Sequence, residues 1–403
     1  MKLTIPTNWS EDYFEKIDFS QTGEIYGKMN PDLIGGGRAA VGMPSIKKDK
    51  IEGFIQKVHD RGMTFSYLIN GTCFDNLEVS RKGYKQIREF LDWLSEIKVD
   101  SVTVALPMLV EVVKKFYPKM QVSVALHTQI NSFERAKYWE SLGADKINVS
   151  HVDVNKDFDE LRRIRKAVKC KIQVLGNLMC QNQCPSVTLH ANFNAHASQN
   201  NHVMKNFGLD YYLASCSGNL LNNPVEILKS AFIRPEDIHL YEKEGVDFLK
   251  LADRYMTTDA LASIVSAYTK RSYDGNIMDL MLSFSKYRMF NEGNLALLKG
   301  MKYVFQPRKV NVIKLGKYLS MLNDLRTKAG FNKSFDLFID NTKLDGFMKI
   351  FYENKCSRNC DECKWCDKYA EKAISYLVPV EEHASNMNMW RETRNVMVSG
   401  DIF

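Results

Sequence analysis

The sequence has no apolar run of the roughly 18 to 20 residues that a membrane-spanning helix needs. Its first residues, Met1 to Pro6, do not contain the apolar core typical of a signal peptide. The 403-residue chain is 45% hydrophobic and 26% charged, which is ordinary for a globular protein and excludes a disordered, collagen-like or coiled-coil chain. We therefore expect a soluble, cytoplasmic protein without a membrane span.

Neither sign of charge is in large excess. The chain has 55 basic and 48 acidic residues, a net charge of +7, which permits an anionic partner without requiring one. Residues 301–330 are the basic exception, because Asp324 is their single acid, and three aromatic residues are interleaved with the positive charges. The basic residues there are Lys302, Arg308, Lys309, Lys314, Lys317, Arg326 and Lys328. This pattern is typical either of a surface that binds RNA or of a solvated helix face.

The sequence lacks the glycine-rich motif of dinucleotide-binding folds, which favours a closed barrel over an open, doubly wound sheet. Segments 97–104, 142–149 and 244–251 each follow a helical pattern and contain a small apolar residue, Asp and a run rich in branched residues. Further strands are predicted at Thr64–Ile69, 122–127, Lys171–Leu175 and 211–215. About eight alternating units over roughly 250 residues predict an α/β fold, a (β/α)8 TIM-like barrel. An open, doubly wound sheet is the competing fold, but no G-x-G-x-x-G motif follows a predicted strand.

The pattern changes near residue 300. We predict a barrel domain over residues 1–300 and a mostly helical, cysteine-rich extension over residues 301–403.

Nine cysteines in a chain without an export signal indicate metal binding or catalysis rather than a disulfide framework. Four of them, Cys356, Cys360, Cys363 and Cys366, lie within eleven residues of the extension. Four thiolates that converge on one centre suit an iron–sulfur cluster or a structural zinc ion, and the spacing leaves both open. The first three also have the C-x3-C-x2-C spacing of radical S-adenosylmethionine enzymes, which normally carry it near the first barrel strand.

Four further cysteines are dispersed, and each follows or ends a predicted strand. They are Cys73, Cys180, Cys184 and Cys216, while Cys170 has the surroundings of an ordinary core residue. In a parallel barrel the carboxyl ends of the strands meet on the face where active sites lie. We therefore expect these four thiols to share one metal centre at that face, which we call the barrel mouth.

Polar residues accompany the predicted strand ends. His127 and His151 end predicted strands, and Arg254 follows the strand near residue 250. His196 lies in the segment 189–198, which we expect to be a loop rich in imidazole and amide groups. The three histidines are candidates for proton transfer, and the arginine is a candidate for binding a carboxylate. The turn Gly35-Gly36-Gly37-Arg38 is a candidate anion cradle.

Taken together, these motifs resemble the collagenase-like peptidase family U32 over most of residues 1–300. The resemblance depends on the glycine turn at 35–38, on Asn70 to Glu78, on Cys180-x3-Cys184-Pro185 with His196-Ala197-Ser198, on Cys216 with 233–237, and on 245–254. Gln173 to Cys180 does not contain the acid that precedes the first core cysteine in the family, and the spacing to Cys184 is shorter. This indicates a divergent branch, to which the substrates of other members are not carried over.

The resemblance implies a barrel and a 4Fe–4S cluster held by Cys73, Cys180, Cys184 and Cys216. Relatives of this kind take part in oxygen-independent hydroxylation of RNA bases or of the ubiquinone ring. The leading hypothesis is therefore an iron–sulfur oxidoreductase or hydroxylase, with a second 4Fe–4S cluster or zinc in the extension. Its substrate is a small molecule, a peptide or RNA, and its partner a redox protein or a homologous subunit.

Two alternative functions stay open. One is a peptidase, as the family name implies, although neither an H-E-x-x-H motif nor a Ser-His-Asp order is found. The other is a non-catalytic iron–sulfur or RNA-binding accessory subunit, which the basic stretch 301–330 favours.

Overall fold

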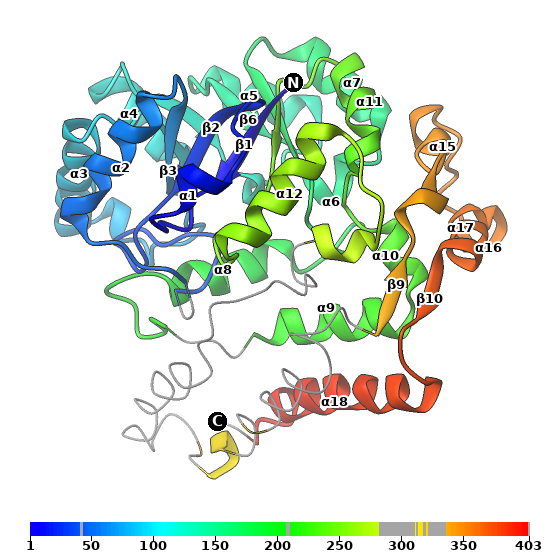
Figure 1. Cartoon of the computed structure of the whole chain (residues 1–403). Helices are drawn as coiled ribbons and strands as arrows, with labels where there is room; N and C mark the ends of the chain where they lie inside the picture. The colour runs from blue at the N-terminus through cyan, green and yellow to red at the C-terminus, as the bar shows by residue number, and fades with distance from the viewer. Residues whose placement is uncertain are drawn as a thin grey trace.

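Eight parallel strands close into a barrel in the computed structural model, which confirms the predicted (β/α)8 fold (Figure 1). The structure describes residues 1–40, 43–206, 210–281, 311, 313–316, 320 and 336–401. The strands pair in chain order, and the last pairs with the first. They are β1 (Lys2–Pro6), β2 (Thr22–Gly27), β3 (Thr64–Ile69), β4 (Ser101–Val104), β5 (Gln121–Val124), β6 (Lys146–Asn148), β7 (Lys171–Leu175) and β8 (Phe248–Lys250).

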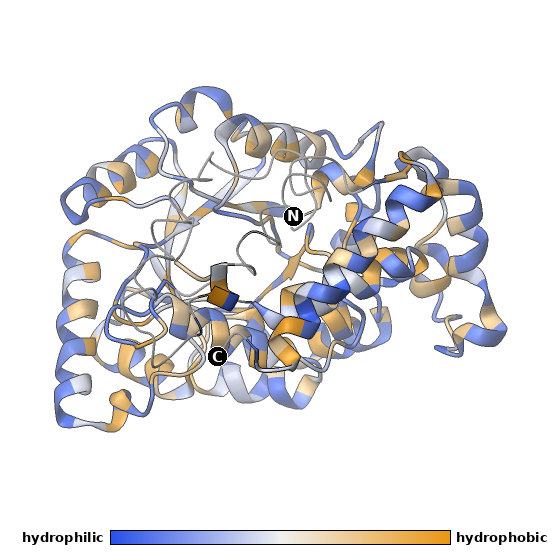
Figure 2. Ribbon diagram, turned by 90° about the horizontal axis from the view of Figure 1, so that it is seen from below, coloured by the Kyte–Doolittle hydropathy of each residue, from blue (hydrophilic) through white to orange (hydrophobic). Residues whose placement is uncertain are grey.

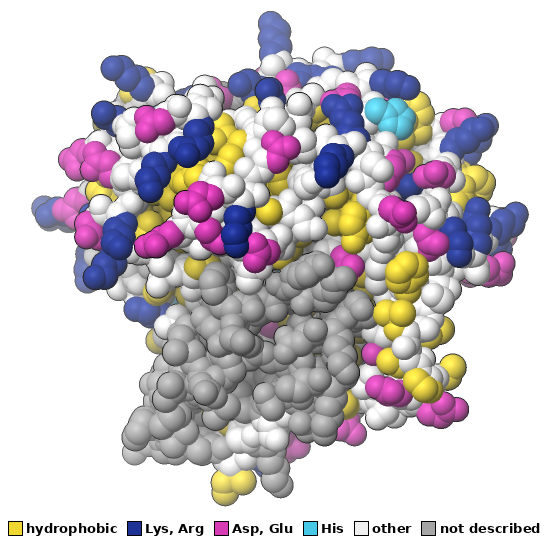
Figure 3. All heavy atoms as spheres, viewed as in Figure 1, with side chains coloured by type: hydrophobic (Ala, Val, Ile, Leu, Met, Phe, Trp, Pro, Cys, Tyr) yellow, Lys and Arg dark blue, Asp and Glu magenta, His cyan; other side chains and the backbone are white. Residues whose placement is uncertain are grey.

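Amphipathic helices cover the outside of the barrel, as the sequence periodicity predicts. In α3, for example, Ile87, Leu91 and Leu94 are buried against the sheet, and the Ser80 side chain caps the helix by accepting from the Gly83 amide. The surrounding helices are α1 (Tyr13–Lys16), α2 (Lys48–His59), α3 (Arg81–Glu96), α4 (Pro107–Phe116), α5 (Phe133–Ser141), α6 (His151–Val154), α7 (Phe158–Ala167), α11 (Ile238–Lys243) and α12 (Thr258–Lys270). Lys, Arg, Asp and Glu side chains intermingle on the barrel surface seen in Figure 3.

Two segments differ from their prediction. Residues 211–215 do not form a strand but begin helix α9 (Tyr211–Asn222), because the Asp210 carboxylate caps the first turn through the Leu213 amide at 2.9 Å. Residues 189–198 are not a loop, since most of them belong to helix α8 (Val187–Ala197). Its buried residues Ala191 and Ala195 lie one turn apart, and this packing outweighs the low helix propensity of the polar residues between them.

The extension is mostly helical, as expected, with one small sheet. Strands β9 (Leu337–Ile339) and β10 (Ile374–Tyr376) pair antiparallel. The helices are α15 (Lys349–Tyr352), α16 (Cys360–Cys363), α17 (Trp365–Ala373) and α18 (Val380–Val398). The expected boundary at residue 300 lies outside the described residues, as does most of the basic stretch 301–330. In the part of the chain that is described, no helix combines the length and apolar character needed to cross a membrane.

Helix α18 lies along α9 beneath the barrel, so the extension covers an element of the barrel domain (Figure 1). Hydrophilic and hydrophobic residues alternate along it in the view from below (Figure 2). Its buried residues Met387, Trp390 and Met397 recur at helical spacing. The ring of His383, also on α18, lies 3.3 Å from the Leu221 carbonyl at the end of α9. The packing is therefore specific to one face of α18.

Arg234 joins the barrel to the extension. Its side chain is 1% exposed, and its guanidinium donates to the Asn341 side chain at 2.8 Å, the Leu344 carbonyl at 2.5 Å and the Asp345 carboxylate at 2.8 Å. The short helix α10 (Val225–Lys229) packs against α17 in the same region. One buried cation thus satisfies three acceptors of the extension.

We predict that Arg234→Met lowers the free energy of unfolding by about 3 kcal/mol, because it removes the donor and leaves buried acceptors without partners. Urea unfolding followed by circular dichroism measures this. Arg163→Met is the matched control, since the Arg163 side chain is 65% exposed and, within the described part of the chain, pairs with Glu160 alone. We expect the control to change stability by less than about 0.5 kcal/mol. Equal effects of the two substitutions would show that Arg234 does not fasten the extension.

Candidate metal centres

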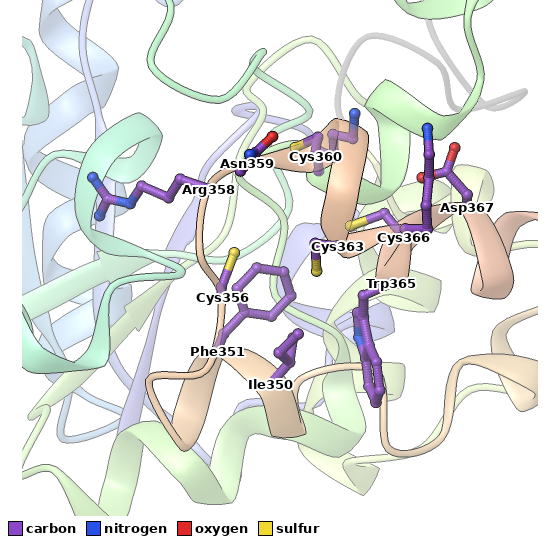
Figure 4. A pocket seen from close by; sticks show the side chains of 12 residues that line it. Ile350, Phe351, Cys356, Arg358, Asn359, Cys360, Cys363, Trp365, Cys366 and Asp367 are labelled. Carbon is purple, nitrogen blue, oxygen red and sulfur yellow. The ribbon is translucent and has the colours of Figure 1, made fainter.

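The four cysteines of the extension surround one pocket. Cys356 precedes α16, Cys360 and Cys363 begin and end it, and Cys366 lies in the first turn of α17. Their sulfur atoms approach a common space, with Trp365 and Phe351 along its side (Figure 4). The left-handed conformation of Lys364, with a φ of 49°, separates the two short helices and allows their thiols to face the same pocket. The donor set suits a four-thiolate metal centre.

Two lysines from the barrel domain lie beside this pocket. Lys229, at the end of α10, lines it, and Lys156 interacts electrostatically with Cys366 and Cys356. Burial lowers the pKa of Lys156 to about 8, although the neighbouring cysteines oppose this. Burial raises the pKa of Cys366 to about 11, and both lysines counteract that rise. Four thiolates around a divalent ion carry a net negative charge, which these two cations would balance.

Three of the four dispersed cysteines interact at the barrel mouth. Cys180 lies in the loop after β7, Cys184 follows in the next turn, and Cys216 lies on α9. Burial, and then the neighbouring Cys216 and Cys184 thiols, raise the pKa of Cys180 well above its usual range. Burial also raises the pKa of Cys216 to about 11, although the Gln181 amide donates to its sulfur. Thiols gathered in this way without a metal stay protonated, and a bound cation would favour their thiolate forms.

Arg38 is a cation that interacts with this thiol group. Its Nε donates to Asp253 Oδ2 at 2.8 Å, and its charge lowers the pKa of Cys180, against the larger effect of burial. Arg254 is also buried, at 3% exposed, and burial lowers its pKa. The mouth thus carries two adjacent guanidinium groups and one carboxylate, Asp253.

The glycine turn before Arg38 is held by a buried ion pair. Lys28 Nζ lies 2.7 Å from Asp32 Oδ1, and both side chains are at most 1% exposed. The same carboxylate accepts from the amides of Ile34 and Gly35, at 3.1 and 2.7 Å. The Gly36 amide donates to the Ser198 hydroxyl at 2.9 Å. The amides of Gly35 and Gly36 are therefore engaged within the protein, contrary to the expectation that the amides of this turn cradle an external anion.

Two of the predicted histidines lie beside Arg38. His127 follows β5 in a short 3-10 turn, and a Cβ on Gly37 would approach its Nε2 to 2.3 Å, so only glycine fits there. His151 begins α6, is 3% exposed, and neither of its ring nitrogens has a hydrogen-bond partner among the described residues. Burial, and then the charge of Arg38, lower the pKa of both imidazoles to about 3, so both are neutral near pH 7.

Cys73 and His196 lie together in a separate group. The Cys73 sulfur is close to the Asp75 carboxylate and the His196 ring, and Cys73 is not among the thiols that shift the pKa of Cys180 or Cys216. The structure thus brings three of the four expected thiols together, and His127, His151 and Arg254 near them. That Cys73 ligates the same centre stays a prediction.

The geometry defines a parallel eight-stranded barrel with cysteine sites at its mouth and in its extension. Residues 36–276 match the model of peptidase family U32, and the chain belongs to that family. An uncharacterized protease of Methanocaldococcus jannaschii, MJ1657, is 27% identical over 344 residues, which cover 85% of this chain and 86% of that protein. The tRNA hydroxylation protein P1 of Bacillus subtilis is 21% identical over 203 residues, covering 48% of this chain and 47% of that protein.

Among solved structures, the U32 peptidase Mk0906 is similar, with 23% identity and a TM-score of 0.48. The match covers 63% of this chain and 93% of that one.

Sequence reasoning did not identify several residues of these sites. The Lys28–Asp32 pair was missed, and Arg38 was named only as part of the glycine turn, because strand β2, which carries two glycines in six residues, was not predicted. Lys156 and Lys229 carry no motif, and only the fold brings them beside cysteines more than 120 positions away. The Cys-x-Asp spacing of Cys73 and Asp75 was a usable signal for a shared ligand group.

Because His151 is unprotonated in the folded protein, we predict that the free energy of unfolding depends on pH. Its pKa is about 3 in the folded protein against an ordinary value of 6.5, so between these values the unfolded chain binds a proton that the folded protein does not. The resulting stability is fully present above pH 6.5 and is lost as the pH falls, by about 1 kcal/mol between pH 7 and 5.5. His151→Gln should remove this part of the slope in urea unfolding experiments. The exposed His239→Gln should keep the wild-type slope, and identical slopes for all three proteins would contradict the assignment.

Proposed function

We propose that this member of family U32 is an iron–sulfur enzyme that carries out an oxygen-independent hydroxylation, or a related redox modification, of a substrate bound at the barrel mouth. The observation that carries the proposal is the group formed by Cys180, Cys184 and Cys216, which lies beside Arg38 on the face where barrel enzymes bind substrates. The tRNA hydroxylation protein among its relatives supports the hydroxylation chemistry.

The residues fit the proposed cofactor. Three mutually interacting thiols would hold a 4Fe–4S cluster and leave one iron without a cysteine, while Cys356, Cys360, Cys363 and Cys366 would hold a second cluster or a zinc ion. When bound, such a cluster supplies one-electron transfer and a coordination position for a substrate oxygen. Hydroxylation by water converts R–H and H2O into R–OH, two protons and two electrons. A redox partner must therefore accept the electrons.

The chain's own residues provide binding and proton transfer. Arg254 is a buried cation and Arg38 a half-buried one, and both can orient an anionic group of the substrate, although Arg38 also pairs with Asp253. His127 and His151 are neutral at pH 7, so each has a ring nitrogen free to accept one of the protons released. The dense packing of Gly37 against His127 holds that imidazole in place.

A peptidase is the second candidate, because the family and the Methanocaldococcus jannaschii relative bear that description. The two functions differ in their need for a cluster. A peptidase would cleave peptides after aerobic purification and metal removal, and Cys180→Ala would leave that rate unchanged. Peptide cleavage only by the cluster-containing protein, or none at all, would leave the redox function in place.

We predict that Cys180→Ala, purified without oxygen, loses about four irons and four sulfides per chain and retains the metal of the extension. Cys363→Ala should lose the metal of the extension and retain the barrel cluster. Cys170→Ala is the matched control, because Cys170 lies at the opposite end of strand β7 from Cys180, and we expect its metal content to equal that of the wild type. Elemental analysis and electron paramagnetic resonance measure these contents. An unchanged iron content in Cys180→Ala would contradict the barrel cluster.

A further inference from the structure

Three different types of metal ligand converge where the loop after β3 meets helix α8. The Cys73 sulfur, an Asp75 carboxylate oxygen and a His196 ring nitrogen all lie within 4.8 Å of one another. Asp75 Oδ1 is 3.6 Å from His196 Nε2 and 3.9 Å from Cys73 Sγ. The contact to His196 is too long for a hydrogen bond, and the contact to Cys73 is a long, weak hydrogen bond of the thiol. Both separations suit donors that surround a shared ion.

His196 lacks the partner that its position requires. Its Nε2 is shielded from solvent and has no hydrogen-bond partner among the described residues. A polar atom withdrawn from water without a partner costs roughly 1–3 kcal/mol, so such atoms in native proteins usually bond to water or an ion. The unpartnered nitrogen faces the Asp75 carboxylate, which places the missing partner between them.

His202 orients the carboxylate. Its Nδ1 accepts from the Met204 amide at 3.0 Å, which places the proton of the neutral ring on Nε2. That Nε2 lies 3.2 Å from Asp75 Oδ2, and the ring stacks on His196 with centroids 4.2 Å apart. His202 therefore holds one carboxylate oxygen and turns the other, Oδ1, toward Cys73 and His196. Positioning of a ligand by a second histidine or carboxylate is typical of metal sites.

The backbone around the ligands is also fixed. Gln199, which follows α8, donates to the Cys73 carbonyl at 2.6 Å and to the Ile34 carbonyl at 3.2 Å. Asp75 has a φ of 53°, in the left-handed region that non-glycine residues rarely adopt. The ligand-bearing loop is thus tied to α8, which carries His196.

We propose that Cys73, Asp75 and His196 bind one zinc ion, separate from the iron–sulfur centres. A mixed sulfur, nitrogen and oxygen set suits this borderline cation, and three protein ligands leave a fourth position for water. The side chain of Asp75 is 53% exposed, so this position is open to solvent. A water bound there at the barrel mouth would be acidified and available as a nucleophile or proton donor. The proposal concerns a different ion from the proposed function and assigns Cys73 to it alone.

The test is the zinc, iron and sulfide content of the full chain, purified without oxygen, supplied with zinc and desalted. We expect about one zinc ion per chain to be lost, relative to the wild type, in each of three variants: Asp75→Asn, His196→Gln and Cys73→Ser. Their iron and sulfide contents should equal those of the wild type. His190→Gln is the matched control on the same helix, because its ring pairs with Asp210 instead, and it should keep the wild-type zinc. Circular dichroism checks that each variant is folded.

Two results would overturn the proposal. One is the same zinc content in Asp75→Asn and His196→Gln as in the wild type. The other is loss of iron and sulfide in Cys73→Ser alone, which would make Cys73 a ligand of the barrel cluster. Because iron is measured in the same samples, failure of the zinc site is distinguished from failure of the iron–sulfur function. Removing the positioning residue by His202→Ala should weaken zinc binding about 10- to 100-fold in competition with a chelator.

Discussion

The buried ion pair between Lys28 and Asp32 is the interaction on which the barrel mouth depends. Two opposite charges so deeply buried are tolerated only when their remaining hydrogen-bonding capacity is satisfied, and Asp32 achieves this with the amides of the glycine turn and the Tyr67 hydroxyl. The Asp32 backbone also bonds to Ser198 and Asn200 beyond α8. One residue thereby joins the end of β2, the turn that carries Arg38 and the helix that carries His196.

The two thiol sites have a common electrostatic design. Each places cysteines that burial would keep protonated beside a cation from another part of the chain: Arg38 at the mouth, and Lys156 of the barrel beside the pocket of the extension. A neighbouring cation lowers the cost of forming thiolates and balances the negative charge of a metal–thiolate centre. The pocket of the extension is consequently incomplete without the barrel, since both of its lysines come from there.

The sequence could predict the barrel and the grouping of most of the cysteines, because these signals are local. Strands such as Thr64–Ile69 and Lys171–Leu175 are apolar runs bounded by polar residues, and their bounds agree with the structure. The segments around His196 and Cys216 were predicted as a loop and a strand, whereas a capping carboxylate in one and buried alanines or leucines in both make them helical. The grouping of Cys73 with Asp75 and His196 depends on how a loop and a helix 120 residues apart meet, which no local pattern encodes.

The segment from Cys216 to Lys229 connects the two thiol sites. Helix α9 carries Cys216 at the mouth, α10 follows and ends at Lys229 on the wall of the second pocket, and α17 and α18 pack against the pair. The matched family region ends at residue 276, so the extension that builds the second pocket lies beyond it. This pair of helices therefore contacts both sites. The extension therefore packs against the barrel and shares the wall of its cysteine pocket with it.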